Sequence, residues 1–108
     1  MKTISSRLVM IIFFAGTVFA GQIFGRVENA GRAVSDAQVE IVCGNNTSSV
    51  RTDRNGSYRI NVATTGRCTI KVTSNNISYS SSVYSYSNPV RYDFELQQRQ
   101  GRPFLKRK

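Results

Sequence analysis

The 108-residue sequence has no histidine, no tryptophan, and only two cysteines and two prolines. Without histidine there is no Ser-His-Asp triad and no histidine-ligated zinc, and two cysteines alone cannot complete a closed structural zinc site. Acidic residues are also scarce, with 6 Asp and Glu against 15 Lys and Arg. They fall in turns or on the polar phase of alternating segments, so they form no obvious acid/base pair. We therefore expect a protein that is not an enzyme and that holds no metal or other cofactor.

Residues 1–20 have the layout of a cleavable secretory signal peptide. Lys2 and Arg7 form a basic head, and an apolar run from Leu8 to Ala20 ends in small residues that suit a signal peptidase. An uncleaved membrane anchor is the alternative, but the run is shorter than the roughly 20 residues that a spanning helix needs. We expect cleavage after Ala20, no transmembrane segment after cleavage, and a secreted or periplasmic product.

From Gly21 onward, apolar residues recur with period two and show no helical stripe, which predicts strands. Turn residues separate the segments, as in Asp53-Arg54-Asn55-Gly56. Short strands with one polar face each, and no helix for a parallel crossover, favour an antiparallel arrangement. We therefore predict an all-β fold, a small antiparallel β-sandwich of about seven strands. The clearest segments are 22–28, 38–43, 58–62, 67–72, 77–86 and 90–96, the segment 77–86 being an expected edge strand.

The two cysteines fall on the same buried phase as their apolar neighbours. Cys43 follows Val39 and Ile41 at even spacing, and Cys68 precedes Ile70 in the same way. In an exported protein, an even pair of inward-facing cysteines favours one disulfide. Its 25-residue loop would stabilise the fold by roughly 3.5 kcal/mol on the chain-entropy argument. A redox-active or metal-binding pair is the alternative, and it would need an accessible thiolate.

Four short motifs occur in order along the sequence. They are G-x-V at 25–27, G-x-x-V at 31–34, A-x-V at 37–39 and T-D-x-x-G-x-Y at 52–58. Together they resemble the carboxypeptidase regulatory-like domains, which are prealbumin-like β-sandwiches also grouped with a carbohydrate-binding-like fold. The resemblance covers about residues 22–96 and departs at Ala33, where the family often has proline. It implies an accessory, non-catalytic module at 21–96, followed by a basic C-terminal tail at 97–108.

Three aromatic residues are candidates for ligand contact because they lie on the phase opposite the expected core. These are Phe24, Tyr84 and Tyr86. Sugar rings stack their C–H faces on such side chains, while neighbouring polar groups bind the hydroxyls. A second apolar face in a two-sheet protein is the alternative explanation.

The C-terminal tail carries five basic residues and no acid. It could contact an anionic envelope polymer, and we do not expect specific recognition of nucleic acid. A solvated terminus is the alternative, as is a tail that packs back on the sandwich through its Pro-Phe-Leu segment. The basic residues are Arg99, Arg102, Lys106, Arg107 and Lys108.

These observations lead to one functional hypothesis and one alternative. The hypothesis is an exported, non-catalytic binding or structural module whose ligand is a carbohydrate of the cell envelope. The alternative is a protein-interaction or envelope-assembly subunit that uses an edge strand or the basic tail.

Overall fold

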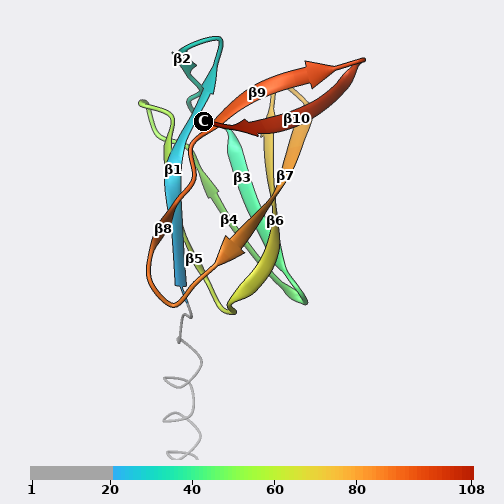
Figure 1. Ribbon diagram of the computed structural model, residues 1–108. Coiled ribbons are helices and arrows are strands. Elements are labelled where there is room, and N and C mark those ends of the chain that lie inside the picture. Colours follow the sequence, from blue (N-terminus) through green and yellow to red (C-terminus); the bar gives the residue numbers. More distant parts are fainter. Residues whose placement is uncertain (1–20) are drawn as a thin grey trace, which may run out of the picture.

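The computed structural model describes residues 21–108, so the expected signal peptide at residues 1–20 lies outside the described residues. The described part of the chain folds into ten strands in two layers (Figure 1). The strands are β1 (Gly21–Asn29), β2 (Arg32–Ala33), β3 (Gln38–Cys43), β4 (Asn46–Arg51), β5 (Ser57–Val62), β6 (Gly66–Ser74), β7 (Ile77–Ser85), β8 (Val90–Arg91), β9 (Phe94–Arg99) and β10 (Arg102–Arg107). Within residues 21–108 there is no helix long and apolar enough to cross a membrane. The predicted all-β sandwich is confirmed.

One sheet has six strands and the other has four. The six-stranded sheet runs β10-β9-β1-β2, with β5 and β8 also paired to β1, and the four-stranded sheet runs β4-β3-β6-β7. All pairs are antiparallel except those of β1 with β8 and with β9, which are parallel. The antiparallel arrangement expected from the sequence thus holds for the other pairs, and β1 adds two parallel ones. The chain reaches β8 from β7, at the edge of the opposite sheet, and this crossover brings it in alongside β1 in the same direction (Figure 1).

The period-two pattern places one apolar face of each main strand in the space between the sheets. Ile23 and Val27 of β1, Ile41 of β3, Ile70 of β6 and Phe94 of β9 are fully buried there. Burial of each such side chain contributes about 1.5–3 kcal/mol to the stability of the fold. The opposite phase of the same strands faces solvent, and this phase carries the charged residues discussed below.

Three hairpins turn through two residues that both have positive φ. The pairs are Ala30–Gly31, Asn75–Asn76 and Gln100–Gly101, with φ between 52° and 83°. Such turns match the right-handed twist of the flanking strands and favour asparagine and glycine. The third of them joins β9 to β10.

Residues 97–108 do not form a free tail. Residues up to Arg99 continue β9, and Arg102–Arg107 pair back on it as β10. Leu105 of β10 is 4% exposed and belongs to the core. The apolar Pro-Phe-Leu segment is therefore part of the sheet. The basic side chains project from a hairpin that is held in place by strand pairing.

The predicted disulfide is confirmed. Cys43 and Cys68 are bonded, with their Cα atoms 4.4 Å apart. The two residues lie one position beyond the paired Val42 and Thr69, at one end of β3 and β6. The bond thus joins neighbouring strands of the four-stranded sheet, and both sulfur-bearing side chains are buried.

Candidate binding site

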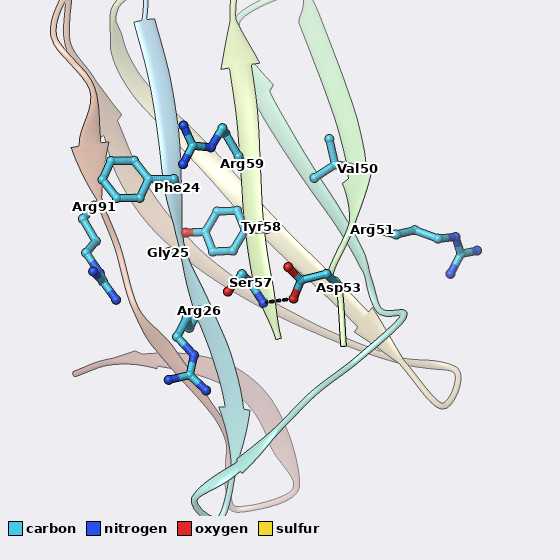
Figure 2. Close-up of a pocket in the computed structure, with 10 residues that line it drawn as sticks. All are labelled: Phe24, Gly25, Arg26, Val50, Arg51, Asp53, Ser57, Tyr58, Arg59 and Arg91. Carbon is cyan, nitrogen blue, oxygen red and sulfur yellow. Dashed lines mark hydrogen bonds between the residues drawn. The ribbon is translucent and has the colours of Figure 1, made fainter. Parts of the chain in front are cut away.

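An open groove of about 490 Å³ lies on the six-stranded sheet and extends past β5 to β4 (Figure 2). Three strands of that sheet build most of it, because β5 and β8 flank β1 on its two sides. The side chains that give the groove its chemistry are Phe24, Arg26, Arg51, Asp53, Arg59 and Arg91.

Phe24 lies between two arginines in a row across three strands. In the register of the sheet, Phe24 pairs with Arg59 of β5 on one side and with Arg91 of β8 on the other. The guanidinium carbon of Arg59 is 5.6 Å from the centroid of the Phe24 ring, which is a cation–π contact. Figure 2 shows the phenyl ring between the two arginine side chains. The groove thus combines an aromatic face with hydrogen-bond donors that carry positive charge.

The arginines of this row differ in how far their charge is neutralised. Arg91 binds both carboxylate oxygens of Asp93, at 3.0 and 3.1 Å. Arg26 lies 3.6 Å from Glu28 and also donates from Nε to the backbone oxygen of Asn55. Arg59 has no carboxylate within 4 Å among residues 21–108. Its guanidinium contacts the Phe24 ring and, at 3.5 Å, the Gln22 side-chain oxygen, so among these three arginines it is the one whose positive charge is not balanced by a carboxylate of the described residues.

The other charged residues of the groove are engaged elsewhere. The Oδ1 atom of Asp53 accepts hydrogen bonds from the backbone of Asn55 and Ser57, at 2.8 and 2.9 Å, and so holds the turn before β5. Arg51 donates to the backbone oxygen of Asp36 at 2.9 Å. In Figure 2 its side chain points away from Phe24. Both side chains are thus held by hydrogen bonds to the backbone outside the row of Arg59, Phe24 and Arg91.

A smaller cavity of about 160 Å³ adjoins the groove and holds a network of charges. The Lys108 ammonium forms an ion pair with Glu28, and the Lys108 amide donates to the backbone oxygen of Asp93. The hydrogen bond from Lys108 lowers the pKa of Glu28, and the same bond raises the pKa of Lys108. This network fixes the end of the chain beside β1.

The predicted aromatic residues do not form one site. Phe24 is in the groove, whereas Tyr84 and Tyr86 belong to neither cavity. The two tyrosines stack on each other, with ring centroids 6.3 Å apart, and they are 46% and 51% exposed. They form an exposed pair at the end of β7, and a role for them in binding stays a prediction.

The expected edge strand β7 is already covered near this pair. The Tyr84 backbone amide donates to the Tyr92 hydroxyl at 2.9 Å, and that hydroxyl donates to the Tyr84 carbonyl at 3.3 Å. The Tyr92 phenol therefore occupies the backbone N–H and C=O of Tyr84, which a pairing strand would otherwise bind at this position. Further along, β10 packs beside β7.

Sequence reasoning missed the arginines that surround Phe24. Each of Arg26, Arg59 and Arg91 lies on the polar phase of its own strand, a pattern that also fits an ordinary solvated face. They lie together because β5 and β8 pair with β1 in a register that brings Arg59 and Arg91 beside Phe24. The sequence did show one arginine on the solvent-facing side of each of three predicted strands. Only the order of the strands in the sheet shows that these arginines lie together.

Comparison with known proteins agrees with the resemblance. Residues 22–97 match the carboxypeptidase regulatory-like domain family. No curated protein matches the sequence. Within residues 21–108, no group of three or more cysteine, aspartate or glutamate side chains lies close enough together to hold a metal ion.

Proposed function

Since this chain belongs to the carboxypeptidase regulatory-like domain family, we propose that it is an exported module that binds carbohydrate in the groove around Phe24. Domains of this family are non-catalytic β-sandwich modules, which supports a binding or structural role. The disulfide supports a secreted or periplasmic location, because such bonds persist in oxidising compartments.

The observation that carries the proposal is the placement of Phe24. An aromatic ring on the floor of an open groove offers its face to the C–H side of a sugar, and arginines on either side can donate to hydroxyl or acidic groups. Next along the same face, the Gln22 side chain donates to the Asn61 side chain at 3.1 Å. The Gln22 oxygen also accepts from Arg59 at 3.5 Å, and the N–H groups of the two amides can donate to sugar hydroxyls.

The groove is a better platform than the tyrosine pair because of its shape. Tyr84 and Tyr86 stack on each other and line no cavity, so a sugar would contact them on one side only. At the groove, Phe24 and its flanking arginines contact a ligand from three strands at once. A protein partner paired to β7 would have to displace the Tyr92 hydroxyl from the Tyr84 backbone.

The test is a glycan array followed by calorimetry with the mature chain and two sets of variants. Phe24→Ala should weaken binding about tenfold, which corresponds to the loss of one aromatic stacking contact. Phe24→Leu, which keeps an apolar side chain without a π face, should weaken it nearly as much. The double variant Tyr84→Ala/Tyr86→Ala is the matched control and should bind as the native protein does. Retained binding in Phe24→Ala, with loss in the tyrosine variant, would move the site to β7 and refute the groove.

A further inference from the structure

A second arginine–phenylalanine pair lies on the β9–β10 hairpin. The guanidinium carbon of Arg99 is 5.3 Å from the centroid of the Phe104 ring. Phe104 is partly exposed and pairs across the hairpin with Gln97. The arrangement repeats that of Arg59 over Phe24.

Both pairs face the same side of the six-stranded sheet. Glu28 of β1 is in register with Glu95 of β9, so the polar phases of these two strands share one face. Gln97 continues that phase, and Phe104 is its partner on β10. Phe104 therefore lies two strands away from β1. Measured along the strand direction, it is six residue positions further on than Phe24. Strand geometry then separates the two rings by about 20 Å.

The second pair carries uncompensated charge. Arg99 and Arg102 are directly opposed across the hairpin. Like charges in this position are destabilising. Neither of them has a carboxylate within 4 Å among residues 21–108, and the same is true of Arg59. An anionic ligand would relieve the repulsion and would gain charge-assisted hydrogen bonds.

The charge of the whole face is strongly positive. Its outward positions hold seven basic residues, which are Arg26, Arg59, Arg91, Arg99, Arg102, Lys106 and Lys108, and three acidic residues, which are Glu28, Asp93 and Glu95. The three acids lie between the two aromatic rings, and Glu28 and Asp93 are paired with basic neighbours. The unneutralised arginines thus lie at the two ends.

We propose that the ligand of this module is an extended acidic polysaccharide, with carboxylate or sulfate groups spaced along neutral sugar rings. It would contact Phe24 and Arg59 at one end and Phe104 and Arg99 at the other. This inference rests on the proposed carbohydrate site at Phe24 and adds both the charge of the ligand and a second contact point. A uniformly charged chain such as a nucleic acid fits less well, because its phosphates would cross the central carboxylates.

Two linked contacts predict a dependence on ligand length. A fragment that reaches both rings gains the second contact at high effective concentration, whereas a short fragment binds one end at a time. We therefore expect long fragments to bind at least tenfold more tightly than short ones. The affinity of long fragments should also fall steeply with salt.

The experiment measures binding of labelled hyaluronan fragments, short and long, to the mature chain by fluorescence anisotropy, because in this polymer a carboxylate-bearing sugar alternates with a neutral one. Neutral dextran and single-stranded DNA serve as comparison probes. The variants are Arg59→Gln and Arg99→Gln, singly and together, with Arg67→Gln on the opposite sheet as the control that removes the same charge. Chondroitin sulfate, which adds sulfate groups to the same alternating pattern, distinguishes the two kinds of acidic group.

We expect each of Arg59→Gln and Arg99→Gln to weaken long-fragment binding about three- to tenfold, while Arg67→Gln has little effect. Either single variant should also reduce the advantage of long fragments over short ones by about the same factor. Three results would overturn the inference: equal losses from Arg67→Gln and Arg99→Gln, equal binding of dextran, or tighter binding of DNA with the same variant pattern. If Arg99→Gln has no effect while Phe24→Ala weakens glycan binding about tenfold, the second contact is refuted and the proposed function stands. If hyaluronan binding is insensitive to Phe24→Ala, the site itself is refuted.

Discussion

The hydroxyl of Tyr58 donates a 2.7 Å hydrogen bond to the backbone carbonyl of Tyr92, and this bond ties β5 to the β8–β9 segment across β1. The Tyr58 side chain crosses β1, the strand between them, at Gly25, which is the residue paired with Tyr58 in the sheet. A Cβ atom at Gly25 would lie 1.8 Å from the Tyr92 oxygen, so the contact requires a residue without a side chain there. Figure 2 shows the Tyr58 ring beside Gly25. This contact explains physically why G-x-V and T-D-x-x-G-x-Y occur together in the sequence.

Replacing Tyr58 by phenylalanine should lower the free energy of unfolding by about 1–3 kcal/mol. The variant keeps the buried ring, which is 4% exposed, and leaves the Tyr92 carbonyl without this donor. Urea denaturation of both proteins measures the difference. Tyr84→Phe, which removes an exposed hydroxyl, is the control and should change stability by less than about 0.5 kcal/mol. Equal stability of Tyr58→Phe and the native protein would show that the hydrogen bond contributes nothing.

The same phenol should make the fold sensitive to high pH. Burial, followed by the negative charge of Asp93, raises the pKa of Tyr58 above its ordinary value of 10. A group whose pKa is raised on folding stabilises the fold fully below its unfolded pKa and loses that contribution as the pH rises above it. Above about pH 10, the native protein should therefore lose up to about 1.4 kcal/mol of stability per pH unit relative to Tyr58→Phe. Denaturation curves of the two proteins at a series of alkaline pH values measure this, and parallel pH profiles would contradict it.

The alternation of residues predicted the strands of the core well, because burial on one face leaves a period-two signal. Segments 38–43 and 58–62 agree with β3 and β5 within one residue. Strand β4 was largely missed, since Asn46–Ser49 carry no large apolar residue and form an edge. Strand β10 was missed because a single buried leucine among basic residues gives no alternation. Its local signals were the Gln100–Gly101 turn and the apolar Pro-Phe-Leu segment, which had suggested a tail that packs back on the sandwich.

If the C-terminal hairpin is part of the core, removing its buried side chain should be costly. Leu105→Ala should lower the free energy of unfolding by about 2–5 kcal/mol, the usual range for a buried leucine. Lys106→Ala, at the neighbouring exposed position, is the matched control and should change it by less than about 0.5 kcal/mol. Thermal and urea denaturation give both values. Similar small changes in the two variants would mean that residues 102–107 behave as a tail in solution.

The candidate site was predictable in part. Phe24 could be found because an apolar residue on a polar phase is unusual, and the disulfide could be found because both cysteines share the buried phase. The cluster of arginines could not, because it depends on which strands lie beside β1. The parallel pairing of β8 with β1, which places Arg91 next to Phe24, has no signature in either segment alone.

The ion pair with Lys108 should lower the pKa of the Glu28 carboxyl group. The hydrogen bond from Lys108 is the main cause that lowers the pKa of Glu28 below its ordinary value of 4.5. A carboxylate with a lowered pKa stabilises the fold above its unfolded pKa, and this contribution is lost as the pH falls through the folded value. Carboxyl NMR should show Glu28 titrating below pH 4.5, and Lys108→Gln should move its midpoint upward. Arg67→Gln, on the other sheet, is the control, and an unchanged midpoint in Lys108→Gln would refute the pairing.

The disulfide joins two strands that the sheet already holds together, so its contribution to stability should come mainly from the unfolded chain. Reduction frees a loop of 25 residues between Cys43 and Cys68, which should lower the free energy of unfolding by roughly 3.5 kcal/mol. Such a loss is a large share of the 5–15 kcal/mol that is usual for a whole domain. Urea denaturation with and without a reducing agent measures it in the native sequence, and Cys43→Ala/Cys68→Ala provides an independent value that should not respond to the reducing agent. If the oxidised and reduced proteins are equally stable, this prediction is wrong. Such a result would mean that the unfolded chain keeps β3 and β6 close together even without the disulfide.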